Sequence, residues 1–302
     1  MGAGMIVALA SALFVLIWST GFIVARALVP HAAPELILAI RLTLTTLLLF
    51  GAAVYARQAL PRGRRLGLHL AAGAMLHGFY LTLSWWAVNN GMPAGIMALL
   101  GALQPLMVAV ASVAFLDDRL PGRAWGGLAI AIIGVGCVLF PAIERSGIGS
   151  ITIWPALAGI AAVLGMAAGT LIQRGAIAGD GIAISGAVQN AGGALVALTA
   201  TLIVGDYRWD GNPVLWIGLG WAVLGLSVAG LSLLVWLVRH QGPTRMSMLL
   251  LLVPPLAATE AWLLFGERLG PVQLVGFALA LGGVMLGRST RPSPHQEIAE
   301  PA

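Results

Sequence analysis

The stretch Phe115-Leu-Asp-Asp-Arg-Leu120 has a similar, five-residue counterpart in the second half of the chain, Phe265-Gly-Glu-Arg-Leu269. An offset of 149 positions superposes the two acid-Arg-Leu triplets, and an offset of 148 superposes Arg26 on Arg174. The 149-residue register also holds for three further pairs: Pro105 with Pro254, Gly127 with Gly276, and Gly134 with Gly283. The sequence therefore predicts an internal repeat, with one copy in residues 1–147, the other in residues 148–288, and a tail at 289–302.

Charged residues make up 9% of the 302 residues, and hydrophobic residues make up 59%. A soluble domain has about 25% charged residues, so this chain has too few charges to cover a surface exposed to water. The composition excludes a soluble enzyme, a disordered chain and a nucleic-acid-binding domain. All 16 basic residues are arginines. Their positions indicate how the chain is oriented in a membrane and do not indicate an anionic ligand.

Ten stretches of the chain are long and apolar enough to cross a bilayer, whose hydrocarbon core needs about 20 residues of helix. They are residues 5–25, 34–55, 68–88, 94–115, 124–140, 153–172, 182–204, 214–238, 246–265 and 271–287. Short loops rich in turn-forming residues join them. The tail at 289–302 is polar and contains proline, so we expect it to be disordered and cytoplasmic.

The arginines predict how the chain is oriented. With the N-terminus inside, eleven arginines fall on the cytoplasmic side and four on the outer side, and Arg41 lies within the second span. The positive-inside rule thus places both termini in the cytoplasm. Each half holds an odd number of spans, so the second half enters the membrane from the opposite side.

The predicted fold is therefore an all-α membrane protein of ten transmembrane helices, arranged as two inverted five-helix repeats. Such repeats are typical of secondary transporters, which expose a site near the bilayer midplane to each side in turn. Channels and membrane enzymes can also carry repeats, so the pattern favours a transporter without deciding it.

Three features carry a resemblance to a known family: Trp18-Ser-Thr-Gly21-Phe22 in the first span, Arg41 in the second, and the repeated acid-Arg-Leu motif. The chain resembles the ten-helix EamA-type exporters of the drug/metabolite transporter superfamily. Its aromatic-rich third span is most similar to the YddG-type exporters of aromatic amino acids. The resemblance implies a central cavity lined by the first, third, sixth and eighth helices and their neighbours. The chain departs from the family at Glu260, where the ninth helix is usually apolar.

His77, Tyr80 and Ser84 form a polar stripe on one face of the third span, at spacings of three and four residues. His77 lies close to the predicted midplane. In one interpretation, Tyr80 and Ser84 hydrogen-bond a neighbouring helix and His77 is a satisfied packing residue. In the other, the stripe lines the cavity, where the imidazole is available to a carboxylate or to a proton.

Arg41 and Glu260 are the other ionisable residues that we place inside the spans, at similar depths of about seven and six residues from the outer end. An ion pair between them would neutralise both charges, which are costly inside a bilayer. Three roles are open for the two residues: a structural clasp on the outer side, a gate, and direct contact with the substrate.

Further candidates for the cavity lining come from the first, sixth and eighth spans: Trp18, Met166, Thr170 and Trp221. Trp18 lies away from both interfaces, where tryptophan is otherwise enriched. The other three are as compatible with core packing as with a cavity, so His77, Tyr80 and Trp18 are the leading candidates.

Proline and glycine mark positions where helices bend or approach each other. Pro105 and Pro254 remove backbone hydrogen bonds inside spans and predict kinks, which act either as hinges or as static bends. Small residues at helical spacing predict that the fourth, fifth, ninth and tenth spans pack closely against one another or at a dimer face: Gly127, Gly134, Gly136, Gly276 and Gly283.

We expect a secondary transporter that exports small zwitterionic or amphipathic metabolites, with aromatic and other hydrophobic amino acids first. A sugar-phosphate exchanger would need several cations in its cavity, and the spans hold only Arg41. The alternatives are an exporter of other drugs or metabolites, such an exchanger, a channel, and a membrane scaffold.

The sequence predicts no catalytic residue, no metal site and no cofactor, because it lacks a convergent set of nucleophilic, acidic or metal-binding residues. The predicted partners are a small-molecule substrate and membrane lipid, without nucleic acid. We expect the protein in the cytoplasmic (inner) membrane, and the sequence is compatible with a monomer or a homodimer.

The topology can be tested with single cysteines introduced at Arg62 and Asn90 of a Cys137→Ala variant. These positions precede and follow the third span, so a membrane-impermeant thiol reagent should reach them from opposite sides of the membrane. Reaction of both cysteines from one side would contradict the ten-helix topology with its N-terminus inside.

Overall fold

The computed structural model describes residues 3–116, 121–144, 153–176 and 180–287. Asp118 and Arg119 of the repeated motif and the predicted tail at 289–302 lie outside these ranges. The helices in order are α1 (Ala3–Leu28), α2 (Pro34–Tyr55), α3 (Arg64–Gly73), η1 (Ala74–Phe79), α4 (Tyr80–Asn89), α5 (Ala94–Ala102), α6 (Gln104–Leu116), α7 (Gly122–Glu144), α8 (Trp154–Ala176), α9 (Ile182–Val204), α10 (Pro213–Gly220), η2 (Trp221–Gly230), α11 (Leu231–Leu250), α12 (Val253–Phe265) and α13 (Pro271–Gly287).

All regular structure in the described residues is helical, apart from one isolated bridge between Ala32 and Trp209. In the same residues, nine helices are long and apolar enough to cross a membrane, and Pro271–Gly287 is a shorter apolar helix. The prediction of an all-α membrane protein is confirmed. The third span, Arg64–Asn89, and the eighth, Pro213–Gly242, extend beyond the predicted ranges at their ends, and each contains a π-helical segment within the predicted range.

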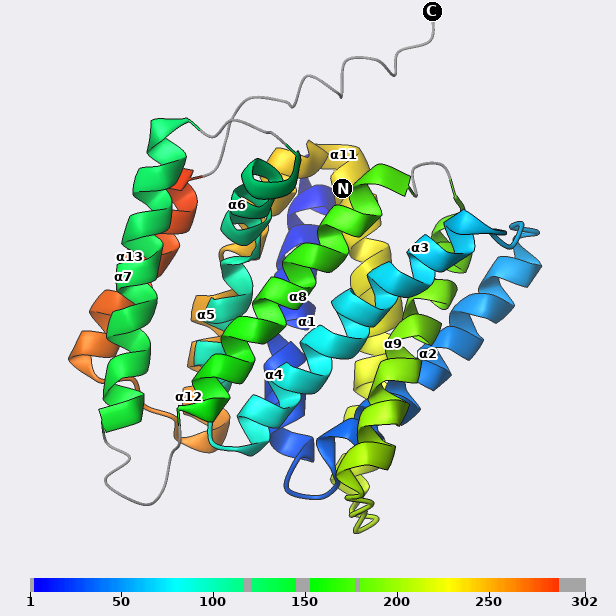
Figure 1. Cartoon of the computed structure of the whole chain (residues 1–302), viewed down its shortest axis with the longest axis horizontal. Helices are drawn as coiled ribbons and strands as arrows, with labels where there is room; N and C mark the ends of the chain where they lie inside the picture. Colours follow the sequence, from blue (N-terminus) through cyan, green and yellow to red (C-terminus); the bar gives the residue numbers. More distant parts are fainter. Residues whose placement is uncertain (1–2, 117–120, 145–152, 177–179, 288–302) are drawn as a thin grey trace, which may run out of the picture.

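Two helix pairs stand at opposite ends of the bundle. Figure 1 shows α7 beside α13 at one end and α2 beside α9 at the other, with the remaining helices between them. Each pair joins a helix of the first half to a helix of the second. The largest apolar core lies mainly among α1, α2, α4, α5, α8 and η2, with Trp85 as its largest fully buried side chain.

The third and eighth spans each contain a π-helical segment, η1 and η2. A π-helix accepts one extra residue per turn, and such segments are rare and frequently occur at functional sites. Inside η2, the Ser227 hydroxyl donates to the carbonyl of Ala222, five residues earlier, at 3.0 Å. The extra residues shift the faces that these two spans present to their neighbours.

The fourth and ninth spans are interrupted just before the prolines that the sequence analysis singled out. The fourth span breaks at Leu103, ahead of Pro105, and the ninth breaks at Leu251 and Leu252, ahead of Pro254. Proline has no N–H, so it fits the first turn of a new helix, where that group has no intrahelical acceptor. The breaks are present; their role as hinges stays a prediction.

Glycine allows α7 and α13 to approach at backbone distance. A Cβ atom on Gly134 would lie 2.6 Å from the Gly276 carbonyl oxygen and 2.8 Å from the Ala280 Cα. Gly136 differs from the prediction, because a Cβ atom there would have nothing within 4 Å. It lies on the exposed face of α7, since two residues turn a helix by about 200°.

Replacing Gly134 with leucine should therefore lower the midpoint of thermal unfolding. Overpacking a filled interface costs about 1–3 kcal/mol, and here the obstacle is backbone, which cannot move aside as a side chain can. Gly136→Leu is the matched control on the same helix. Thermal unfolding of both purified variants in detergent checks the prediction, and an equal loss in the two variants would contradict it.

Candidate functional site

Arg41 is buried inside the bundle and forms no ion pair with an acidic residue in the part of the chain that the structure describes. Its side chain comes from α2 and is only 9% exposed. Nη2 donates to the Ser227 hydroxyl of η2 across 3.5 Å, the upper limit for a hydrogen bond, and the buried Nε has no partner. The guanidinium also interacts electrostatically with His77 and Tyr80. We call Arg41, His77, Tyr80 and Ser227 the Arg41 cluster.

The third and eighth spans supply the rest of this cluster. His77 belongs to η1, Tyr80 begins α4, and Ser227 belongs to η2, so the two π-helical segments converge on Arg41. Helix α9 lies directly behind His77, because a Cβ atom on Gly193 would be 2.7 Å from the His77 Cβ. The Tyr80 hydroxyl lies near the end of α5, 3.3 Å from the Cβ position of Gly101.

An aromatic group and further hydroxyls surround the cluster. The rings of Phe22 and Tyr80 meet edge to face with centroids 6.4 Å apart. The hydroxyls of Thr45, one turn after Arg41, and Ser84, one turn after Tyr80, are fully buried and have no hydrogen-bond partner. Phe22, His77 and Tyr80 remain partly accessible. A guanidinium N–H and two hydroxyls without partners are the groups that a carboxylate or amino group of a small ligand would satisfy.

The other aromatic candidates, Trp18 and Trp221, make contacts between α1 and η2. Trp221, the first residue of η2, donates its indole N–H to the Thr20 hydroxyl at 2.8 Å and is 42% exposed. Trp18 packs against Phe14, with ring centroids 5.0 Å apart, and lies close to Gly230 at the end of η2. These contacts connect α1 to η2, and none of them brings Trp18 to His77 or Tyr80.

The candidates on the sixth span face the broken fourth span. The Thr170 hydroxyl donates to the Met166 carbonyl at 2.9 Å and accepts from the Gln104 amide at 2.7 Å. Gln104 directly precedes Pro105, so Thr170 contacts the start of α6. A role of Met166 and Thr170 in substrate binding stays a prediction.

Arg41 and Glu260 have different partners, contrary to the expected ion pair. Glu260 Oε1 lies 2.7 Å from the Ser19 hydroxyl of α1, and Oε2 is buried without a partner. Arg41 instead contacts Ser227. The number of residues from a span end gives the depth of a side chain, and it does not determine which face of the helix the side chain occupies.

The predicted outer side does carry a clasp, made by residues that the sequence analysis did not pair. Arg26 Nε lies 3.3 Å from Glu267 Oε1, and Glu267 Oε2 accepts from the Ala94 N–H at the start of α5 at 3.0 Å. Burial raises the pKa of the Glu267 carboxyl, and the Ala94 N–H and Arg26 oppose that rise. This contact joins α1, α5 and the end of α12. In the sequence, the acid-Arg-Leu motif and Arg26 are the features from which this contact could have been predicted.

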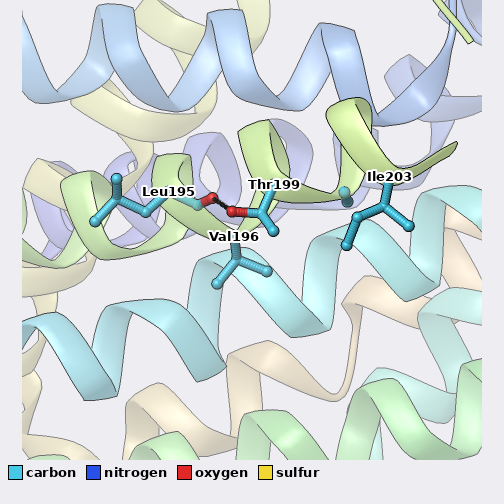
Figure 2. A pocket seen from close by; sticks show the side chains of 5 residues that line it. Leu195, Val196, Thr199 and Ile203 are labelled. Atoms are coloured by element: carbon cyan, nitrogen blue, oxygen red, sulfur yellow. Dashed lines mark hydrogen bonds between the residues drawn. The ribbon is translucent and has the colours of Figure 1, made fainter. Parts of the chain in front are cut away.

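A shallow apolar depression of about 350 Å³ lies on α9. Figure 2 shows Leu195, Val196, Thr199 and Ile203 along it, with the Thr199 hydroxyl bonded to the Leu195 carbonyl at 2.8 Å. Its lining has no charged residue and its hydroxyl is already satisfied by the helix. The depression therefore suits hydrocarbon of the surrounding membrane and not a polar substrate.

Ser227 and Thr45 are the residues of the site that sequence reasoning missed. Nothing in their local pattern separates them from other hydroxyl residues of the spans. Their position follows from the π-helical segments and from the face of α2 that points inward, which the tertiary structure decides. Across the described residues, no group of three or more His, Cys, Asp or Glu is placed to hold a metal ion.

The sequence pattern of the EamA-like transporter family matches residues 3–140 and, separately, residues 153–287. The chain belongs to this family. The expected resemblance to EamA-type exporters of the drug/metabolite transporter superfamily is thereby confirmed. Family membership indicates a multi-pass membrane transporter and not an enzyme, while the closer likeness of the transporter to YddG-type exporters stays a prediction.

Two curated relatives and one solved structure are similar to the transporter. A probable terminal-alkyne amino-acid exporter of Streptantibioticus cattleyicolor is 28% identical over 75% of this chain and 74% of its own. A probable amino-acid metabolite efflux pump of Escherichia coli (strain K12) is 23% identical over 91% of this chain and 92% of its own. A crystal structure with a TM-score of 0.63 covers 93% of this chain and 97% of its own at 17% identity, which shows the fold alone.

Proposed function

We propose that this transporter exports small zwitterionic or amphipathic metabolites, with aromatic and other hydrophobic amino acids first, from a site at the Arg41 cluster. The observation that carries the proposal is the buried Nε of Arg41, which has no partner in the structure. A buried cation without a counter-ion is costly, and a substrate carboxylate would supply the missing charge. The names of the two curated relatives, both amino-acid exporters or efflux pumps, agree with this substrate class.

The surroundings of Arg41 fit the rest of an aromatic amino acid. Phe22 and Tyr80 offer aromatic surface, which adds about 0.5–1.5 kcal/mol to the burial of another ring. His77 and the Ser84 hydroxyl are available to the amino group. A single guanidinium suits one carboxylate and disfavours a sugar phosphate, whose doubly charged group would call for several cations.

Access to this site is proposed to alternate between the two sides as two inverted halves, residues 1–147 and 148–288, rock against each other. The separate matches of one family pattern to each half support the repeat. Corresponding discontinuities support it too: π-helical segments in the third and eighth spans, and breaks before Pro105 and Pro254 in the fourth and ninth. We place the transporter in the cytoplasmic (inner) membrane, with both termini inside.

The substrate class predicts counterflow in liposomes. Purified transporter, reconstituted into vesicles loaded with unlabelled phenylalanine or tryptophan, should accumulate the labelled amino acid from outside, and protein-free vesicles provide the control. A vesicle population that moves a phosphorylated sugar or a quaternary cation, and neither amino acid, would contradict the substrate assignment. Linear conductance without saturation would indicate a channel, and no flux of any solute would indicate a scaffold.

Arg41→Gln should reduce phenylalanine transport about 10- to 100-fold, because a hydrogen bond to a charged group contributes about 1.5–3 kcal/mol. Arg64→Gln, an exposed arginine at the start of α3, is the matched control and should transport normally. His77→Leu and Tyr80→Ala should also reduce transport while leaving thermal stability nearly unchanged.

Competition by phenethylamine, which lacks the carboxylate, separates binding from folding. The wild-type protein should prefer phenylalanine, and Arg41→Gln should lose that preference. An Arg41→Gln variant that keeps the preference would show that Arg41 does not bind the carboxylate, and equal losses of stability and flux in the His77 and Tyr80 variants would assign those residues to packing.

A further inference from the structure

Helix α1 contacts two carboxylates, one on α12 and one just after it. Ser19 contacts Glu260 of α12, and Arg26 contacts Glu267, which follows the C-terminal cap of α12 at Gly266. Ser19 and Arg26 are seven residues apart, two turns of α1, so they lie on one face of that helix, about 10 Å apart along it. We call them the inner and outer rungs.

The two rungs have opposite electrostatic surroundings. Glu267 in the outer rung has the Arg26 guanidinium and the Ala94 N–H as partners. Glu260 in the inner rung has the Ser19 hydroxyl alone, while its buried Oε2 has no partner. The inner carboxyl also lies inside the ninth span, Met248–Phe265, where an uncompensated charge is costly.

The hydrogen bonds of the Ser19 hydroxyl indicate whether Glu260 is protonated. The Ser19 hydroxyl lies 2.7 Å from Glu260 Oε1 and 2.9 Å from the Leu16 carbonyl oxygen. A hydroxyl carries one hydrogen, and a carbonyl can only accept. An ionised Glu260 would compete with Leu16 for that hydrogen. A protonated Glu260 donates to Ser19, and Ser19 then donates to Leu16, so that each contact has its own hydrogen.

The neighbours of α12 provide no ion-pair partner for Glu260 in the described structure. Helix α5 has no ionisable residue, and the one on α1, Arg26, is held by Glu267 in the outer rung. The ionisable residues of α11 are Arg239, His240 and Arg245, and among the described residues Glu260 forms no ion pair with any of them. A proton is therefore the cation that this site is built to take.

We propose that Glu260 and Ser19 form a proton-binding site that couples proton entry to substrate export, which rests on the export function proposed above. A proton from water on the outer side binds a carboxylate oxygen of Glu260, crosses with the change in access and leaves to water on the cytoplasmic side. No other bond forms or breaks. Helix α1 connects this site to the proposed substrate site. Close to Ser19 on this helix, Thr20 accepts a hydrogen bond from the Trp221 indole, and Phe22 packs on Tyr80 of the Arg41 cluster.

The proposal is tested with the full chain in liposomes that contain a pH-sensitive dye and labelled phenylalanine. In the wild-type protein, an outward phenylalanine gradient should drive proton entry, and a pH gradient should drive accumulation. Glu260→Gln keeps the shape and neutrality of the protonated side chain but cannot bind and release a proton. Proton flux should therefore fall at least about 10-fold. It should still exchange labelled for unlabelled phenylalanine, because exchange needs no net proton movement.

Glu267→Gln is the matched control, since it makes the same chemical change in the outer rung and should keep proton coupling. Ser19→Ala should shift the pH at which proton flux is half-maximal, because it removes the hydrogen-bond partner of Glu260. Thermal unfolding shows whether each variant is folded. If Glu260→Gln does not fold, Ser19→Ala provides the test in its place.

The outcomes separate the two proposals. Absence of phenylalanine exchange in the wild-type protein overturns the export function. Exchange by the wild-type protein without proton movement overturns coupling while export stands. Full proton coupling in Glu260→Gln, or an unchanged pH profile in Ser19→Ala, overturns the assignment of the site to Glu260 and Ser19.

Discussion

A guanidinium buried in a membrane-spanning bundle without a carboxylate is the constraint on which the central arrangement depends. Placing an arginine at the centre of a membrane helix costs about 2.5–3.5 kcal/mol even on insertion scales. Arg41 recovers little of this from its neighbours, because its contact with Ser227 is 3.5 Å long and its Nε has no partner. Packing of the surrounding helices must therefore hold the side chain there.

The two π-helical segments explain how different spans reach one arginine. Each adds a residue to a turn, which rotates the following part of the helix relative to its start. In the third span this places Tyr80 at the end of the segment, and in the eighth it places Ser227 inside it. The glycines of α9 let that helix pack directly against η1, and this packing restricts the orientation of His77.

Helix α1 contacts both carboxylates and the aromatic side of the Arg41 cluster. Within eight residues it reaches α12 through Ser19, η2 through Thr20, α4 through Phe22, and the start of α5 and the end of α12 through Arg26 and Glu267. Because one helix makes these contacts, a movement of α1 changes the inner rung, the outer rung and the aromatic side of the Arg41 cluster together. A coupling mechanism needs such a shared element that two sites bias.

The sequence by itself determined the class and the course of the chain. Low charge and long apolar runs establish membrane-spanning helices, since backbone groups inside lipid must be satisfied within the segment. The register of Pro105 with Pro254 anticipated breaks in the fourth and ninth spans, and the stripe of His77, Tyr80 and Ser84 anticipated a polar region in the third. These features depend on local spacing, which sequence records directly.

The tertiary structure alone decided which polar groups meet. Sequence depth suggested that Arg41 pairs with Glu260, but the faces of α2 and α12 give them Ser227 and Ser19 instead. The pairing depends on helix rotation, which the π-helical segments and the glycine contacts change without any signal in the local periodicity. Interior charges are sensitive to this rotation because one helical position turns a side chain by about 100°, enough to move it from a counter-ion to a hydroxyl.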